Sequence, residues 1–329
     1  MNIRSKNLMH LLRSILCAYG TILTHCTFAQ TPTPEIFSPG VISGPISDAA
    51  PAFTPDGNTV YFHRGGPGLK GVILVSHFRD GHWAAPEIAP FSGQWQDIEP
   101  AMAPDGSYLI FSSNRPAVRG GQALNGAWNG KSYPDGGGNL WRVDRKGEGW
   151  GEPYRLPDVV NSDSSVFSPA ISADGAVYFM KPVGDTGKFH LYRCAYRDGQ
   201  YQLPIRLPFS MVDSVADVDL ALAPDESFAV FCSRRPPATH LDLWIIFQDN
   251  GSWGTPINLG PEVNRAAYHI EARLSSDHRR VYFSCSYVPK PADIPSKKED
   301  RQIALDHSGW ETGLDNIWSV PLDKWLEGR

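Results

Sequence analysis

The sequence predicts an all-β protein, a β-propeller with five blades of four antiparallel strands each. One short phrase recurs five times at spacings of roughly 50 to 70 residues, a period found in solenoids, propellers and arrays. Its copies share an aspartate near their ends: Asp56, Asp105, Asp174, Asp225 and Asp277. The segments between the copies hold short apolar runs without a helical period, which indicates strands and favours a propeller.

The first two strands of each repeat flank a turn. Residues 51–57 read Pro-Ala-Phe-Thr-Pro-Asp-Gly, residues 100–106 read Pro-Ala-Met-Ala-Pro-Asp-Gly, and an apolar run that ends in an aromatic residue follows, as at Tyr61-Phe62. Two short strands joined by Pro-Asp-Gly predict a hairpin. The aspartate is assigned to the turn because its side chain can bond to the backbone two residues on.

Two more strands complete each repeat. A third apolar pair recurs, for example Leu140-Trp141 and Leu243-Trp244, and four repeats continue with an aromatic residue three positions before a proline, as in Trp253-x-x-Pro256. The fixed positions of these aromatic residues assign them to packing within and between blades. Four short strands in each repeat are typical of a propeller blade.

The ring is expected to close through its own ends. The fifth repeat has no fourth strand, whereas residues 34–41, ahead of the first repeat, resemble the fourth-strand residues 153–160. An N-terminal strand can therefore complete the last blade and remove the exposed strand edges that invite aggregation. Six blades remain the alternative, because the long second repeat has room for a degenerate blade.

The first 29 residues differ from the rest. Arg4 and Lys6 precede an apolar stretch at residues 15–23, and small residues end at Ala29, a pattern typical of a cleaved signal peptide. The stretch is too short for a membrane anchor. We therefore expect a signal peptide at 1–29, a single propeller domain at 30–329, no transmembrane segment after cleavage, and a secreted or periplasmic protein.

Composition excludes one class of partner. Hydrophobic residues make up 41% of the chain, charged residues 20%, and the formal net charge is -5. Such a chain has no basic surface for nucleic acid. Cleavage of the signal peptide would leave Cys194, Cys232 and Cys285, an odd number, and their positions in strands predict buried free thiols instead of a disulfide framework.

The repeats resemble a known family. The Pro-Asp-Gly phrase is followed by Ser-Ser-Asn-Arg-Pro at 112–116 and by Asn-Leu-Trp at 139–141, which resembles the WD-like repeats of TolB-type propellers over nearly all of the mature chain. The third and fifth repeats depart from the pattern at Ala173 and Ser276. The resemblance implies a secreted propeller but no single function, since such propellers include periplasmic scaffolds and modules attached to peptidases and polysaccharide lyases.

Acidic residues precede the innermost strands, at the mouth of the expected axial channel. Residues two apart on a strand share a side, so seven polar groups are expected to ring this mouth. They are Asp48, Asp97, Glu99, Asp217, Asp219, His269 and Glu271. No cofactor is certain, but carboxylates suit a divalent cation such as calcium, with Asp97, Glu99, Asp217 and Asp219 as candidate ligands. Glu99, Asp219 and Glu271 are the candidate catalytic residues, because paired carboxylates can cleave glycosidic bonds.

A structural role for these groups is the other interpretation, in which they cap turns or line a solvated channel. On the same face Arg64, Arg115 and Arg235 follow second strands, where they either contact a ligand or pair with carboxylates. Two loops there, residues 112–138 and 284–315, exceed the usual length and hold the aromatic candidates Trp128 and Trp310. Each loop is interpreted as either a lid or a disordered insertion.

Two functions are consistent with these features. The first is a binding or scaffold module whose long-loop face contacts a protein or glycan. The alternative is a carbohydrate-active enzyme, a polysaccharide lyase or glycoside hydrolase, with carboxylates and a divalent cation at the axial mouth. The binding module is favoured because no spacing among the acidic residues is specific for catalysis.

Overall fold

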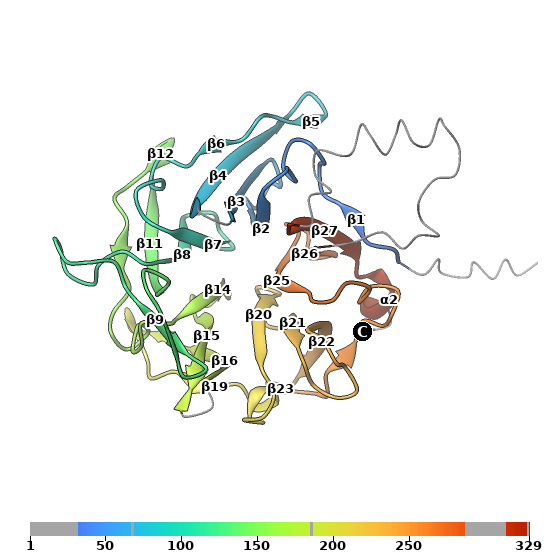
Figure 1. Ribbon diagram of the computed structural model, residues 1–329. Helices are drawn as coiled ribbons and strands as arrows, with labels where there is room; N and C mark the ends of the chain where they lie inside the picture. Colours follow the sequence, from blue (N-terminus) through green and yellow to red (C-terminus); the bar gives the residue numbers. More distant parts are fainter. Residues whose placement is uncertain (1–31, 67–68, 185–186, 287–313, 328) are drawn as a thin grey trace, which may run out of the picture. The chain divides into compact units, whose positions relative to one another are not determined.

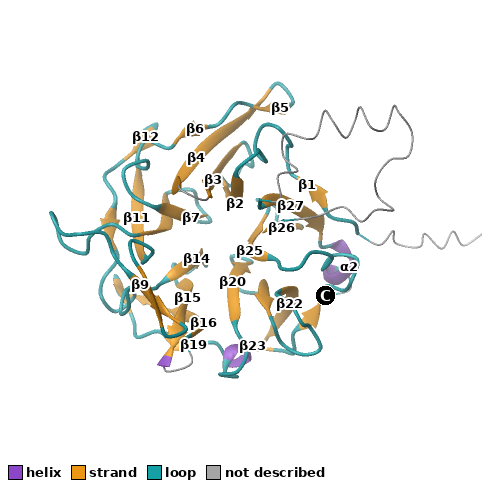
Figure 2. Ribbon diagram, viewed as in Figure 1, coloured by secondary structure: helices purple, strands orange, loops and turns teal. Residues whose placement is uncertain are grey.

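The computed structural model describes residues 32–66, 69–184, 187–286, 314–327 and 329. These residues form a five-bladed β-propeller, as Figure 1 shows, and strands dominate its secondary structure (Figure 2). The predicted signal peptide lies outside the described residues. Within them, no helix has the length and apolar character needed to cross a membrane.

Each blade is an antiparallel sheet in which successive strands lie progressively farther from the axis. The first blade consists of β2 (Ser47–Phe53), β3 (Thr59–Gly66), β4 (Leu69–Arg79) and β6 (Glu87–Ile88). The second consists of β7 (Asp97–Met102), β8 (Tyr108–Ser113), β11 (Asn139–Lys146) and β13 (Tyr154–Arg155). The third consists of β14 (Phe167–Ile171), β15 (Val177–Val183), β16 (Lys188–Cys194) and β19 (Ile205–Arg206). The fourth consists of β20 (Asp217–Leu222), β21 (Phe228–Ser233), β22 (Asp242–Asp249) and β24 (Ile257–Asn258).

The fifth blade confirms the predicted closure. It combines β25 (Ile270–Leu274), β26 (Arg280–Cys285) and β27 (Asn316–Pro321) with β1 (Glu35–Ile36) from the other end of the chain. Ile36 lies opposite Trp318 in the antiparallel register. Five blades therefore close the ring, and the six-blade alternative is wrong. The extra length of the second repeat instead holds a hairpin of β9 (Gly126–Trp128) and β10 (Lys131–Tyr133).

Short outer hairpins extend four of the blades. They are formed by β5 (His82–Trp83), β12 (Gly149–Trp150), β17 (Tyr196–Arg197) with β18 (Gln200–Tyr201), and β23 (Ser252–Trp253). The remaining elements are a short 3-10 helix, η2 (Pro208–Ser210), and α2 (Asp323–Leu326).

The repeated turns and aromatic residues have the structural roles expected of them. The Asp56 carboxylate accepts hydrogen bonds from the Asn58 amide at 3.0 Å and the Thr54 hydroxyl at 2.6 Å. The Trp150 indole of the second blade donates to the Tyr61 hydroxyl of the first at 3.1 Å, which joins the two blades. Cys194, Cys232 and Cys285 are free and buried, as predicted.

An irregularity recurs in every innermost strand and positions the channel residues. Each of the five strands shifts register at a bulge. One residue of each bulge has a left-handed backbone, with φ between 50° and 57°: Ala50, Glu99, Ser168, Asp219 and Glu271. This conformation costs a non-glycine residue about 1 kcal/mol and recurs at functional or packed positions. Three of the predicted acidic residues therefore occupy bulges.

Candidate functional site

The predicted acidic residues fall into two groups with different partners. In the first group, three buried aspartates each pair with an arginine from the end of the second strand of the same blade. The three nitrogen–oxygen distances are 2.6 Å for Arg64–Asp48, 3.0 Å for Arg115–Asp97 and 2.7 Å for Arg235–Asp217. All three arginines were candidate ligand contacts. In the structure, each guanidinium instead forms an ion pair with the aspartate of its own blade.

Arg115 and Arg235 also donate hydrogen bonds to the backbone of the segment that leads into the innermost strand of their own blade. Arg115 donates to the Phe91 carbonyl at 2.6 Å, and Arg235 donates to the Phe209 carbonyl at 3.1 Å. Burial raises the pKa of Asp48, although the adjacent Arg64 guanidinium opposes this effect. These contacts support the structural interpretation for Asp48, Asp97 and Asp217, because each pair fastens an innermost strand to the chain before it.

His269 occupies the equivalent position in the fifth blade and is also structural in its contacts. It is buried, its Nδ1 lies 3.1 Å from the Leu241 carbonyl, and its ring packs on Phe283 at 5.3 Å. Burial lowers its pKa, so the ring is neutral at neutral pH. The His269 ring therefore packs between Leu241 of the fourth repeat and Phe283 of the fifth blade.

The second group is a buried cluster around the axis, defined here as Glu99, Asp219, Glu271, His63 and Arg273. The Glu99 carboxylate accepts hydrogen bonds from the Ser112 hydroxyl at 2.8 Å and the Ser168 amide at 2.7 Å. His63 Nδ1 accepts the Glu99 amide at 3.2 Å, and its Nε2 lies 3.8 Å from Glu271 Oε1. The members of the cluster come from blades one, two, four and five, and the bond from the Ser168 amide adds blade three.

Burial controls the charge of this axial cluster. It raises the pKa of Glu99 to about 7, with the Asp219 charge adding to the effect. Burial also raises the pKa of Asp219, and raises the pKa of Glu271 well above its ordinary value. The pKa of His63 falls to about 3 through burial and the nearby Arg273 charge. Near neutral pH the cluster therefore retains protons on carboxyl groups while His63 is uncharged.

Arg273 is the cation of the axial cluster and a functional candidate that the sequence prediction missed. Its Nη1 donates to the Ala272 carbonyl at 2.7 Å, its Nε lies 3.4 Å from the Pro100 carbonyl, and its Nη2 has no hydrogen-bond partner. Only 5% of the residue is exposed. The signal was present in the repeats, because the corresponding positions Ala52, Ala101, Ala170 and Ala221 are all alanine.

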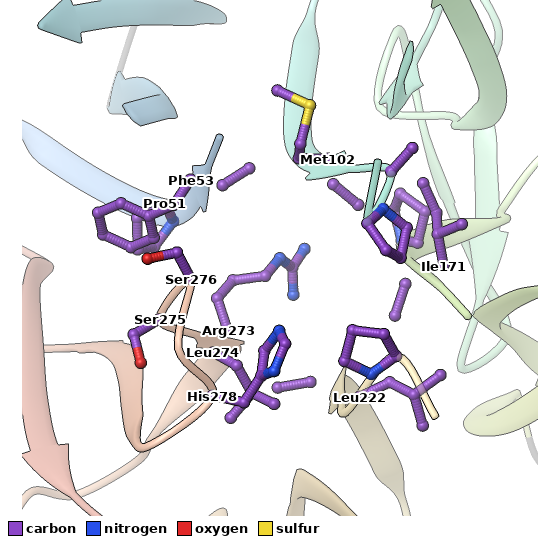
Figure 3. A pocket seen from close by; sticks show the side chains of 18 of the residues that line it. Pro51, Phe53, Met102, Ile171, Leu222, Arg273, Leu274, Ser275, Ser276 and His278 are labelled. Atoms are coloured by element: carbon purple, nitrogen blue, oxygen red, sulfur yellow. The ribbon is translucent and has the colours of Figure 1, made fainter. Parts of the chain in front are cut away.

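A cavity of about 140 Å³ opens beside Arg273 on the face that carries the Pro-Asp-Gly turns. We call it the turn-face funnel. Its apolar ring takes one residue from the same position of each innermost strand: Phe53, Met102, Ile171, Leu222 and Leu274. Figure 3 shows the Arg273 side chain extending among these residues. The funnel thus combines a mostly apolar wall with one buried guanidinium, and Ser275, Ser276 and His278 add polar groups to its lining.

The candidate cation ligands are divided between the two groups. Asp97 and Asp217 pair with arginines, whereas Glu99 and Asp219 belong to the axial cluster. Among the residues that the structure describes, no three His, Cys, Asp or Glu side chains are grouped as metal ligands. A buried guanidinium beside Glu99 and Asp219 also supplies the positive charge that a cation would bring.

The long loop of the second repeat is ordered as the β9–β10 hairpin. Trp128 stacks on Tyr133 with ring centroids 3.8 Å apart. It also makes T-shaped contacts with Phe167 and Phe189 of the third blade, with centroid distances of 5.9 Å and 5.6 Å. This part of the loop is therefore packed, and the interpretation as a disordered insertion is wrong for it. The other aromatic candidate, Trp310, lies outside the described residues, as does most of the fifth-repeat loop.

Comparison with protein families and with curated proteins finds no match to this chain. Among solved structures, TolB from Acinetobacter baumannii is similar at 14% identity and a TM-score of 0.47, with 84% of this chain and 54% of that chain covered. A gluconolactonase from Xanthomonas campestris is similar at 11% identity and a TM-score of 0.45, with 89% and 94% covered. A xylan β-1,4-xylosidase from Bacillus halodurans gives 12% identity and a TM-score of 0.44, with 77% and 52% covered.

The chain spans about half the length of the TolB and xylosidase structures that it matches. The three neighbours include two proteins with enzyme names and one without, so they do not distinguish between binding and catalysis.

Proposed function

We propose that this protein is a secreted or periplasmic binding propeller, not an enzyme, and that it holds an apolar carboxylate in the turn-face funnel. The observation that carries the proposal is Arg273, a buried guanidinium with an unpartnered Nη2 beside a mostly apolar cavity, whose other polar lining residues are Ser275, Ser276 and His278. A charge-assisted hydrogen bond to a carboxylate would satisfy this donor, and such bonds are stronger than neutral ones. Apolar walls with few polar groups are typical of ligand sites.

The carboxylates of the axial cluster support binding more than catalysis. Glu99 and Asp219 are 5% and 3% exposed. The funnel is lined by Arg273 but by none of the three carboxylates. A general acid or base must come within hydrogen-bond reach of its substrate, and a ligand in the funnel would meet the Arg273 side chain instead of a carboxylate. The protons that Glu99 and Glu271 retain reduce the negative charge behind the ligand.

The volume of the funnel limits the ligand. At about 140 Å³ it accepts a short chain and not a large molecule. Either a small fatty acid or the carboxyl-terminal residue of an extended peptide has the required apolar body and anionic end. The sequence analysis favoured the opposite, long-loop face for a protein or glycan, and that expectation remains a separate prediction.

The test uses hexanoate and hexanamide as matched probes, titrated against the mature protein by saturation-transfer NMR. Hexanoate should bind at least tenfold more tightly, because only the acid pairs with Arg273. Arg273→Ala, which restores the alanine of the four other repeats, should remove the preference, and Arg273→Lys should keep part of it. Met102→Trp narrows the funnel without touching the charge and should weaken both probes.

Two further probes distinguish the sources of the carboxylate. The tripeptide Ala-Leu-Leu with a free carboxyl terminus should bind better than its amide if the natural ligand is a peptide end. Equal binding of hexanoate and hexanamide, or hexanoate binding unchanged in both Arg273→Ala and Met102→Trp, would reject the funnel as the site.

A further inference from the structure

A second hollow lies on the turn face between blades two and three. It consists of two adjoining cavities of about 550 Å³ and 470 Å³, which share Arg142, Tyr196 and Tyr201. Ala103 and Pro104 line both the larger cavity and the turn-face funnel, so the hollow extends outward from the rim of the funnel. We call it the tyrosine groove. Each cavity is within the range of ordinary small-molecule sites.

Four tyrosines give the groove its character, and two of them are unusually open to solvent. They are Tyr108, Tyr154, Tyr196 and Tyr201. Tyr154 is 44% exposed and Tyr196 is 39% exposed. The rings of Tyr196 and Tyr201 lie 4.9 Å apart at 57°. Tyrosine presents an apolar ring face and a hydroxyl group together, which suits ligands that have both apolar and polar surfaces.

Charged groups lie between the tyrosine rings. Arg142 covers the Tyr108 ring at 3.6 Å from its centroid and pairs with Asp144 at 2.7 Å. Asp105 and Asp174 line the larger cavity. Asp174 also pairs with Arg193 at 2.9 Å, so the groove presents carboxylate and guanidinium groups beside aromatic faces, mostly as matched ion pairs.

We propose that the tyrosine groove binds a neutral oligosaccharide. A sugar ring has C–H faces that stack on aromatic rings and hydroxyl groups that bond to carboxylates and guanidinium, and the groove offers both kinds of partner. Its two adjoining cavities provide room for consecutive sugar units. Arg142 and Arg193 are already paired with Asp144 and Asp174, so neither guanidinium is free for the carboxylates of an acidic polysaccharide, and Asp105 would repel them. The ligand is therefore a neutral one. This binding site is independent of the funnel and of Arg273.

The first blade contains a matched control for the groove. Phe78 pairs with Trp83 across the hairpin as Tyr196 pairs with Tyr201, and the two ring pairs are 5.3 Å and 4.9 Å apart. Phe78 is 40% exposed, close to the exposure of Tyr196, and it lines neither cavity of the groove. Phe78→Ala therefore removes an equivalent aromatic ring from the same place in the repeat.

The experiment titrates the mature protein by calorimetry with xylohexaose, cellohexaose and maltohexaose, and with trigalacturonate as the acidic probe. At least one neutral hexasaccharide should bind. Its affinity should fall at least tenfold in Tyr196→Ala and in Tyr154→Ala, and less than twofold in Phe78→Ala. Circular dichroism and melting temperature check that the variants fold.

Absence of binding by all three neutral probes would overturn the proposal. So would equal losses in Tyr196→Ala and Phe78→Ala, which would assign the effect to blade stability. Preferential binding of trigalacturonate would show that the charge argument is wrong. If the wild type bound no sugar but bound a peptide, and Tyr196→Ala or Tyr154→Ala removed that binding, the groove would be a protein-binding surface. Folded variants with the predicted tenfold loss would establish the oligosaccharide site.

Discussion

At the scale of single residues, Arg273 belongs both to the axial cluster and to the turn-face funnel. Its guanidinium is the positive charge nearest to Glu99, Asp219 and Glu271, and it is also the charged group of the funnel. Three ionised carboxylates and one arginine would leave excess negative charge in a buried site, which is costly. Raised carboxyl pKa values reduce that charge, because the carboxylic acids hold their protons near neutral pH. The cluster therefore makes stability depend on pH.

The first prediction concerns Glu99→Gln. Since the pKa of Glu99 is raised from 4.5 to about 7 in the folded protein, the unfolded chain releases this proton first, and wild-type stability falls as pH rises between these values. Each proton contributes about 1.4 kcal/mol per pH unit. In Glu99→Gln, the free energy of unfolding should therefore fall less steeply with pH, by the slope that one proton contributes. Urea unfolding across this pH range measures the slope.

Asp105→Asn is the control with the opposite sign. The Ser107 hydroxyl and amide lower the pKa of Asp105, so its stabilising effect is present at neutral pH and is lost as pH falls below the usual aspartate range. A parallel slope in wild type and Glu99→Gln between about pH 5 and pH 7 would show that Glu99 is ionised in the fold.

The second prediction concerns the buried arginine–aspartate pairs. Arg115→Ala leaves the buried Asp97 carboxylate with the Ser92 and Ser113 hydroxyls but without its counter-charge. Removing one partner of a buried pair costs about 3–5 kcal/mol, whereas an exposed pair contributes about 0–1 kcal/mol. The exposed Arg279–Asp323 pair supplies the control, Arg279→Ala. Denaturant unfolding that gives equal losses for the two variants would contradict a fastening role for Arg115.

At the scale of elements, the repeat phrase predicted strands, turns and closure because those features depend on local chemistry. An aspartate recurs in all five turns, with proline and glycine beside it in the first two, and the fixed aromatic positions specify the blades. The bulges were not predictable, because Ala50, Glu99, Ser168 and Glu271 are not residues that favour a left-handed backbone, and only Asp219 is of a type enriched there. Arg273 could have been found from the sequence, because the other four repeats have alanine at the corresponding position. The tyrosine groove was missed because Tyr201 occupies a position that elsewhere packs blades, and only the folded chain places it beside Tyr108.

The β9–β10 hairpin provides the third prediction. Trp128 joins this hairpin to Phe167 and Phe189, so Trp128→Ala should free the hairpin locally while the melting temperature of the propeller changes little. Hydrogen exchange should accelerate at residues 126–133 and remain slow in β14 and β15. Tyr133→Phe keeps the stacked ring and should leave exchange unchanged. If a partner binds the long-loop face, Trp128→Ala should also weaken that binding. This outcome tests the binding surface predicted from the sequence.

At the scale of the whole molecule, the ring depends on a short segment near the start of the chain. β1 supplies the outer strand of the fifth blade, and Phe37 next to it contacts Phe53, Trp83 and Tyr282 at 5.8 Å, 5.7 Å and 5.0 Å. These contacts join the fifth blade to the first. Without β1, the edge of β27 would be unpaired, and exposed edges pair with other chains.

The fourth prediction follows from this closure. A chain that starts at residue 32 should keep its melting temperature and resist aggregation, whereas one that starts at residue 40 loses β1 and Phe37 and should melt at a lower temperature and aggregate. In the longer chain, Phe37→Ala should cost about 2–3 kcal/mol, because most of a phenylalanine side chain leaves its aromatic partners. Light scattering and thermal unfolding measure the two effects separately. If both chains behaved alike, the first and last blades would have to be held together by their other contacts, and the N-terminal strand would be dispensable for closure.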